Sequence, residues 1–163
     1  MKLPGGKKAL IVGIPLGLAV AGGLAFTQLS GASAGPPPVP DPKAGQHGVM
    51  LALDERVINL ATGGQYRYAK VGLTVELRPA SAGFYDLTGK ARSDEEKTET
   101  ANYEASVPVL LDTLGTVVAS EDSVSLTTAD GRKHLKDDLL AGVRGVVGEK
   151  EVLDIYFTDF VMQ

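Results

Sequence analysis

The stretch RYAKVGLTVEL, residues 67–77, decides the fold class because apolar and polar side chains alternate along it. A period of two places every second side chain on the same face of a β-strand, whereas a helix needs apolar residues every three or four positions. The predicted apolar face consists of Ala69, Val71, Leu73, Val75 and Leu77. The opposite face carries Tyr68, Lys70, Thr74 and Glu76. The sequence therefore predicts a strand with one buried face.

Two further runs of strand-forming residues flank this stretch along the chain. The run VMLALDERVINLA, residues 49–61, precedes it, and the residues TGGQ at 62–65 supply a turn whose glycines tolerate positive φ. These two features predict a β-hairpin. The run VLDIYFTDFVM, residues 152–162, is aromatic and β-branched, and its apolarity predicts a strand in the interior of a sheet.

Two amphipathic helices are predicted between the strands. The first lies in residues 101–120, with Ser106 as N-cap and Pro108 in the first turn. Its apolar face is Leu110, Leu114, Val117 and Val118. The second begins at the N-cap Thr127 and ends at the C-cap Gly148. Its apolar stripe is Leu135, Leu139, Leu140, Val143, Val146 and Val147.

The segment between the hairpin and the first predicted helix mixes Pro, Gly, Ser and charge, so residues 79–98 predict a long irregular connection. Its charged run, residues 94–97, invites a metal site, but a solvated surface explains it better because hard cations need several fixed oxygen ligands. The order strand, strand, helix, helix, strand in residues 49–163 predicts an α+β domain, with helices packed on one face of a small sheet.

An apolar segment, residues 9–29, precedes this domain. Residues 9–40 contain no charge, and 21 residues of helix span about 31 Å, the thickness of a hydrocarbon core. The lysines in residues 1–8 predict a cytoplasmic N-terminus and an extracytoplasmic body. A cleaved signal peptide is the alternative, since Ala-Ser-Ala at 32–34 resembles a cleavage site. The length of the apolar run favours a retained transmembrane helix.

Small residues recur at every fourth position of this span, at Gly13, Gly17, Ala21 and Ala25. Such a stripe lets a second membrane helix approach closely, although small residues are also common in membrane helices that have no partner. No ionisable residue lies in the span, so this helix alone offers no path for ions.

A Gly- and Pro-rich tether, residues 30–48, connects the span to the domain. The residues GPPPVPDP at 35–42 include five prolines, which favour an extended polyproline II spacer of about 25 Å. A ligand for an SH3-like groove is the alternative interpretation of the same residues.

The composition excludes several classes of function. Of the 16 basic and 20 acidic residues, all of the acidic ones and 13 of the basic ones follow residue 40, and an acidic body argues against nucleic acid as a partner. The chain has no Cys, which excludes disulfides, thiol catalysis and iron–sulfur clusters. The length of 163 residues corresponds to about one domain.

Two motifs imitate catalytic or metal sites. The sequence GASAG at 31–35 spells GxSxG, but a nucleophile elbow needs a strand before it and a helix after it. Asp130, His134 and Asp138 share one helical face, which is equally typical of a solvated surface. His47 stands alone in the tether. We therefore predict no catalytic, cofactor-binding or metal site and no enzymatic activity.

Several segments together resemble one known family. After the basic N-terminus, the span and the tether, these are VINL at 57–60, YAKV at 68–71, LKD at 135–137 and the ending VLDIYFTDFVMQ at 152–163. On these residues the chain resembles the flagellar basal-body-associated protein FliL family. The positions that carry the family motif are Asn59, Leu60, Lys70, Tyr156, Phe157, Thr158, Phe160 and Gln163.

This resemblance implies a single-pass inner-membrane protein whose extracytoplasmic FliL-like domain, residues 49–163, is similar to a stomatin or SPFH domain. It implies a non-enzymatic protein at the bacterial flagellum basal body. The implied partners are other copies of the chain in a ring, the lipid bilayer and the stator proteins MotA and MotB. The implied role is support of stator activity, torque and swimming or swarming motility. The alternative function is that of an exported binding domain, released after Ala34, with an unknown ligand.

Overall fold

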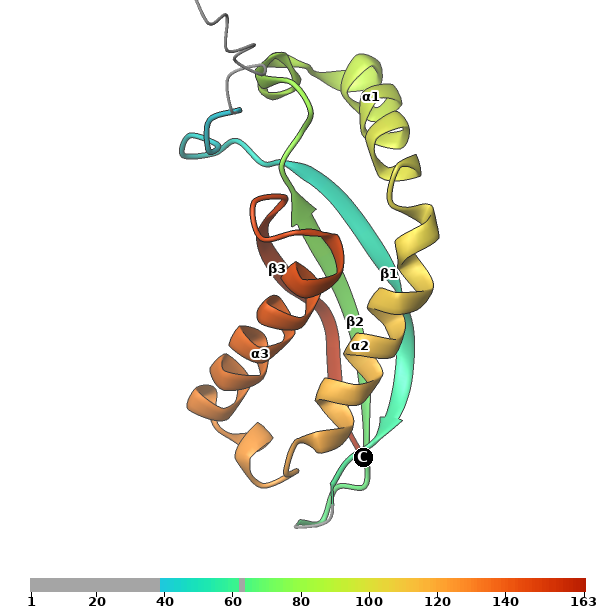
Figure 1. Ribbon diagram of the computed structural model, residues 1–163. Coiled ribbons are helices and arrows are strands. Elements are labelled where there is room, and N and C mark those ends of the chain that lie inside the picture. Colours follow the sequence, from blue (N-terminus) through green and yellow to red (C-terminus); the bar gives the residue numbers. More distant parts are fainter. Residues whose placement is uncertain (1–38, 62–63) are drawn as a thin grey trace, which may run out of the picture. The chain divides into compact units, whose positions relative to one another are not determined.

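The computed structural model describes residues 39–61 and 64–163, which belong to one compact unit, Pro37–Gln163 (Figure 1). The predicted transmembrane segment 9–29, its small-residue stripe and the GxSxG motif lie outside the described residues. Among the residues that are described, no helix combines the length and the apolarity needed to cross a membrane.

The sheet has three antiparallel strands in the order β1-β2-β3: β1 is Val49–Asn59, β2 is Tyr68–Leu77 and β3 is Val152–Met162. This confirms the predicted hairpin and the α+β class. The prediction that the last strand is interior was wrong, because β2 lies in the middle and β3 at an edge. The apolar residues of β3 reflect one face packed on the core, a burial that needs no second neighbouring strand.

The helices cover one face of this sheet, and the hydrophobic core lies between them (Figure 1). All five residues of the predicted apolar face of β2, from Ala69 to Leu77, are fully buried. The cross-strand partners of this face, Leu51 on β1 and Ile155 on β3, are buried at the same level of the sheet beside Val75. Alternation along one strand thus located the core-facing side of the whole sheet.

The two predicted amphipathic helices are present as α2, Val107–Ser120, and α3, Ala129–Val147. The buried part of each predicted stripe is Leu110, Leu114 and Val118 on α2, and Leu135, Leu139 and Val143 on α3. The other stripe residues, Val117, Leu140, Val146 and Val147, are partly buried against the core. Short 3-10 turns at Glu104–Ser106 and Ser125–Thr127 precede these helices.

The caps of these helices agree with the sequence in part. Pro108 lies in the first turn of α2, and Ser106 occupies the N-cap position without a side-chain hydrogen bond. Thr128, one residue after the predicted Thr127, caps α3 by accepting a hydrogen bond from the amide of Gly131 at 3.0 Å. Gly148 ends α3 with φ of 114°, a conformation that favours glycine.

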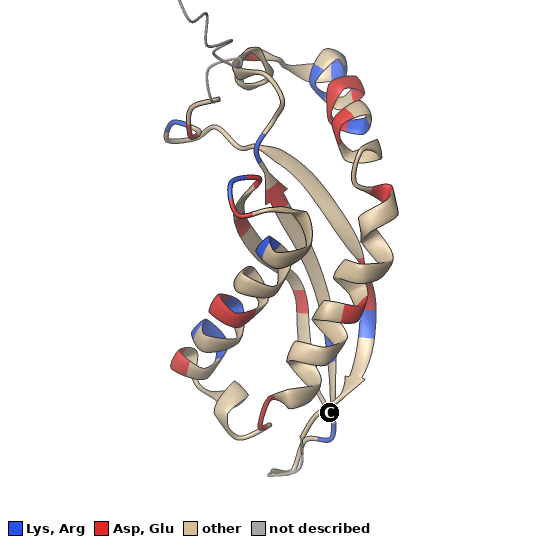
Figure 2. Cartoon of the chain, viewed as in Figure 1, with Lys and Arg blue, Asp and Glu red and all other residues tan. Residues whose placement is uncertain are grey.

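The predicted irregular connection at residues 79–98 was wrong, because it contains the 3-10 helix Ala82–Asp86 and most of α1, Gly89–Ala101. Helix α1 has no apolar stripe and carries both basic and acidic residues (Figure 2). Polar side chains attach it to the rest of the domain. The Arg92 guanidinium donates to the carbonyl oxygens of His47 and Gly48 at 2.8 and 3.0 Å. A search for hydrophobic periodicity cannot detect a helix held in this way.

Two carboxylates complete the attachment of α1. Glu96 accepts a hydrogen bond from the amide of Met50 at 2.9 Å, at the outer edge of β1. Glu99 is buried and accepts from the amide of Ala80 at 2.9 Å. The two carboxylates thus give these backbone amides hydrogen-bond partners in place of the water that they lose on folding.

Candidate functional site

The face of the sheet opposite the helices carries the polar side chains that the sequence singled out. We call it the open face. Its middle strand contributes Lys70, Gly72, Thr74 and Glu76, which alternate with the core-facing residues of β2. Tyr156 of β3 lies beside Thr74 and is 37% exposed, and Val57 of β1 lies beside Lys70 and is 71% exposed.

Two β-bulges bend the sheet at Gly72. In β1 the register shifts between Leu53 and Arg56, so that two residues oppose Gly72. In β3, Asp159 pairs with Gly72 while Phe157 pairs with Leu73, which leaves Thr158 as the extra residue. Bulges increase local bending and twist, and here one bulge lies on each side of the same glycine.

A side chain at this position would crowd its neighbours. A Cβ atom on residue 72 would lie 2.7 Å from Oγ1 of Thr158 and 3.3 Å from the backbone nitrogen of Asp159. Both distances are shorter than ordinary van der Waals contact. The extra residue of β3 therefore occupies the space that a side chain of the central strand would need.

Lys70 joins the two bulges across the open face. Its Nζ atom lies 2.6 Å from Oδ2 of Asp159 in the bulge of β3 and 2.7 Å from Oε2 of Glu55 in the bulge of β1. Hydrogen bonds to Asp159 and then to Glu55 raise the pKa of Lys70 above its usual range. The amine stays charged at physiological pH and pairs with one carboxylate from each flanking strand at the bend.

A second polar cluster forms around Glu76, which is only 3% exposed. Its carboxylate accepts hydrogen bonds from the amide of Gly48 at 2.6 Å and from the hydroxyl of Tyr156. The Nδ1 atom of His47 lies 3.5 Å from Oε1 of the same carboxylate. His47, predicted to stand alone in the tether, therefore lies against the sheet.

Tyr156 is stabilised in its protonated form. The hydrogen bond to Glu76, and secondarily burial, raise the pKa of Tyr156 to about 12. The Nζ atom of Lys136 on α3 lies 5.4 Å from the centre of the Tyr156 ring and 2.9 Å from Oδ1 of Asp154. A tyrosine that keeps its proton at physiological pH is suited to hydrogen bonding and contact, whereas a general base near pH 7 needs a pKa close to that value.

The end of the predicted tether is fixed to the domain. Arg78, at the end of β2, donates to the carbonyl oxygen of Val39 at 2.8 Å and binds the carboxylate of Asp41 at 2.6 Å. Tyr85 donates to the carbonyl oxygen of Pro40 at 3.3 Å, and burial raises the pKa of this tyrosine. The chain therefore enters the domain at a defined place beside the end of β2.

The remaining family-motif positions gather at the other end of the sheet. Leu60 is buried, and the neighbouring Asn59 pairs with Tyr68 at the end of the hairpin. The carbonyl oxygen of Gln163 accepts from the amides of Arg67 and Tyr68 at 2.7 and 2.9 Å. The last residue of the sequence thus extends the pairing of β3 with β2 through its backbone.

Phe157 and Phe160 pack on the helix-covered side of β3. Their rings meet edge to face, with centroids 5.4 Å apart, a geometry that contributes about 0.5 to 1.5 kcal/mol beyond burial. Because Thr158 is the extra residue of the bulge, both rings face the core although they are three positions apart. The motif positions of β3 therefore specify a bulged strand with an aromatic pair.

The candidate metal ligands do not converge. Asp130, His134 and Asp138 lie on α3, where His134 and Asp138 approach to 3.5 Å. On α1, Asp94 pairs with Lys90 within the same helix. Within residues 39–61 and 64–163, no group of three or more His, Asp or Glu side chains is placed to hold a metal ion.

Comparisons with known proteins agree with the resemblance noted above. Residues 50–163 match the family described as flagellar basal body-associated protein FliL. The chain is also 29% identical, over 117 residues, to the flagellar protein FliL of Aquifex aeolicus (strain VF5). This match covers 71% of the chain and 62% of the Aquifex protein, so the chain matches somewhat less than two thirds of its relative's length.

Proposed function

Because the chain belongs to the FliL family of flagellar basal-body-associated proteins, we propose that it is a non-enzymatic accessory of the flagellar motor that acts on the stator units. The observation that carries the proposal is the extent of the match. It begins at Met50, the second residue of β1, and continues to Gln163. All of the sheet except Val49, and every helix described above, therefore lie within the matched residues.

In this proposal, residues 1–8 are cytoplasmic, residues 9–29 span the inner membrane, residues 30–48 form the tether and residues 49–163 lie outside the membrane as a stomatin-like domain. The charge-free apolar stretch and the preceding lysines support this topology. The contacts of Arg78 with Val39 and Asp41 support a fixed entry of the tether into the domain.

The mechanism that we propose is lateral self-association. Copies of the domain form a ring around the segment of MotB just outside the membrane and favour the active, ion-conducting stator. The ion path belongs to the stator, since the span of this chain contains no ionisable residue. The expected result is greater torque and better swimming and swarming.

Cross-linking in native membranes tests association directly. With an amine-reactive reagent, we expect a ladder of oligomers of the full chain and an adduct with MotB. A chain that stays monomeric and captures no stator protein would contradict the proposal. The chain contains no Cys, so cysteine variants can then locate the contact. Disulfide-linked dimers of Gly17→Cys, with Leu16→Cys as the neighbouring control, would place the small-residue stripe at an interface.

Deleting the gene tests the role in the cell. We expect weaker swimming, a larger defect in swarming, and fewer stator units at the motor. Complementation with the full chain should restore all three properties, whereas residues 49–163 exported behind a cleavable leader should not. The intact mass of the mature protein separates the exported-domain alternative, which requires a chain that begins at Gly35.

A further inference from the structure

Helix α1 faces the domain with polar side chains. Of its 13 residues, those that are partly or fully buried are Arg92, Glu96, Glu99 and Thr100, and both of its alanines are exposed. The first three are spaced i, i+4 and i+7, so they form one face of the helix. Within the described residues, α1 adds nothing to the hydrophobic core, to which α2 and α3 contribute three buried residues each.

Arg92 holds the end of the predicted tether. Its guanidinium donates to the carbonyl oxygens of His47 and Gly48, the last two residues of that segment, and to the carbonyl oxygen of Phe84 at 3.2 Å. The Cζ atom of Arg92 lies 3.8 Å from the centre of the Phe84 ring, a cation–π contact over a buried aromatic side chain. One side chain of α1 thus joins the tether to the domain and covers Phe84.

The two carboxylates of this face bind backbone amides in other parts of the domain. Glu96 accepts from the amide of Met50, which points away from β2 at the outer edge of β1. Glu99 accepts from the amide of Ala80, in the segment that follows β2. Both amides lie outside α1, so their protection from solvent depends on whether α1 is in place.

The sequence of α1 opposes a stable isolated helix. The basic residues Lys90 and Arg92 lie in the first turn and the acidic Glu99 lies in the last, which is the reverse of the order that the helix dipole favours. Thr88, at the N-cap, makes no side-chain hydrogen bond. A helix of 13 residues is marginal in water even without these features. Helix α1 therefore depends on its contacts with the domain.

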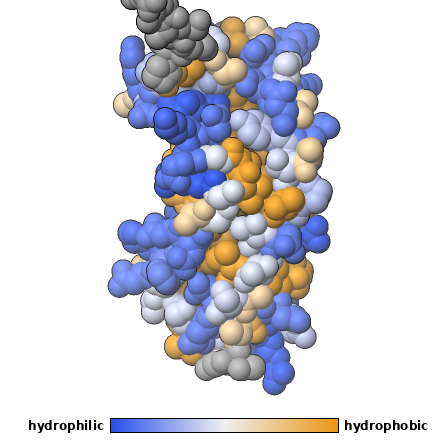
Figure 3. All heavy atoms as spheres, viewed as in Figure 1, coloured by the Kyte–Doolittle hydropathy of each residue, from blue (hydrophilic) through white to orange (hydrophobic). Residues whose placement is uncertain are grey.

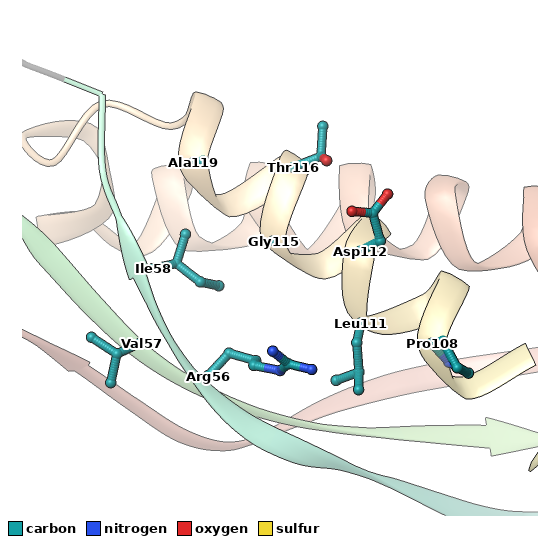
Figure 4. Close-up of a pocket in the computed structure, with 9 residues that line it drawn as sticks. All are labelled: Arg56, Val57, Ile58, Pro108, Leu111, Asp112, Gly115, Thr116 and Ala119. Atoms are coloured by element: carbon teal, nitrogen blue, oxygen red, sulfur yellow. The ribbon is translucent and has the colours of Figure 1, made fainter.

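The surroundings of α1 do not enclose it. The surface over α1 is mainly hydrophilic (Figure 3). Helix α2 follows α1 along β1, and a groove of about 550 Å³ lies there between Ile58 of β1 and Leu111 and Gly115 of α2 (Figure 4). Side chains of α2 therefore do not close the edge of β1 at this groove, and α1 covers the first residues of the strand through the polar contacts described above.

We propose that α1 is a releasable cover, which leaves the domain as one unit while the three strands, α2 and α3 remain folded. Elements with few buried apolar contacts open at a lower free energy than the core. Release frees the carbonyl oxygens of His47 and Gly48, with which the predicted tether ends, and uncovers the amide of Met50 at the outer edge of β1. The state of α1 thereby contributes to how firmly the tether is joined to the domain. Release of α1 does not depend on the motor role.

Hydrogen exchange of the full chain in lipid nanodiscs tests this release. The amides of Met50 and Ala80 are the reporters, because each is bound by a carboxylate of α1 although neither lies in α1. The amide of Leu51 is the internal control, because successive residues of a strand point their backbone groups to opposite sides, so this amide points to β2. We expect both reporters to have the protection factor of the amides within α1, at least about tenfold lower than that of Leu51.

Glu96→Gln distinguishes release of the whole helix from loss of one hydrogen bond. It should lower the protection factors of Met50, of Ala80 and of α1 together by about tenfold, because a neutral acceptor replaces a charged one. The amide of Ala80 is bound by Glu99, so only departure of the helix as a unit couples it to residue 96. The matched control is Glu95→Gln, on the exposed side of the same helix, which should leave all of these values unchanged.

Three results would each overturn the proposal. The first is an α1 that is as well protected as Leu51. The second is a Glu96→Gln variant in which the amide of Met50 exchanges faster and that of Ala80 does not. The third is a variant in which the protection of Leu51 falls by the same factor as that of α1, because α1 would then open only with the whole domain.

Discussion

Replacing Gly72 by alanine tests the explanation given for the bend in the sheet. The new Cβ atom would lie 2.7 Å from Oγ1 of Thr158 and 3.3 Å from the backbone nitrogen of Asp159. In an unobstructed strand, Gly→Ala stabilises a protein by about 0.5 to 1 kcal/mol, whereas overpacking a filled site costs about 1 to 3 kcal/mol. We expect the clash to dominate, and Gly72→Ala to lower the free energy of unfolding by about 1 to 2 kcal/mol.

Two further variants isolate the cause. Thr158→Ala removes the nearest clashing atom, so the Gly72→Ala/Thr158→Ala double variant should be more stable than the sum of the single effects predicts, by at least about 0.5 kcal/mol. Gly115→Ala is the control for glycine itself, because no atom lies within 4 Å of its added Cβ atom. On α2 this change should stabilise the protein by up to about 1 kcal/mol.

The assay is urea unfolding of the full chain in detergent, followed by circular dichroism. The slope of the free energy against urea should stay the same in every variant, because the surface exposed on unfolding is unchanged. If Gly72→Ala is as stable as the parent chain, or if its effect adds independently to that of Thr158→Ala, the steric explanation of the two bulges is refuted.

Two other predictions concern single side chains. Because the pKa of Tyr156 is raised to about 12, its hydrogen bond to Glu76 stabilises the fold fully below the unfolded pKa of about 10 and is lost as pH rises through the folded value. In a tyrosinate absorbance titration, Tyr156→Phe should remove the step near pH 12, and an unchanged profile would contradict the assignment. Thr128→Ala should cost about 1 kcal/mol in thermal unfolding because α3 loses its N-cap, whereas Thr127→Ala should cost less; equal losses would refute the choice of Thr128.

The parts of the fold that depend on apolar periodicity could be predicted from the sequence. The alternation in β2 and the stripes of α2 and α3 each require a buried face, and burial leaves a repeating pattern in the residues. Helix α1 leaves no such pattern, because Arg92, Glu96 and Glu99 attach it through charged groups that also occur on solvated loops. The edge position of β3 could not be predicted either, because apolar residues indicate a buried face but not the number of neighbouring strands.

The sequence does contain one indication of the bend in the sheet. An isolated glycine within a strand pattern is typical of a bulge or a close approach of the backbone, and Gly72 stands alone in the middle of β2. The role of Lys70 could not be predicted in the same way. Its two partners, Glu55 and Asp159, are 104 positions apart and meet only because both flanking strands bulge at the same level.

The contacts of Arg78 with Val39 and Asp41 have a mechanical consequence. Any pull that arrives from the N-terminal side of the chain meets this arginine before it reaches the hydrogen bonds of β1. Because Arg78 directly follows β2, part of such a load passes to the central strand and does not reach the edge strand β1 directly. The point at which force enters the domain is therefore set by Arg78 as well as by β1.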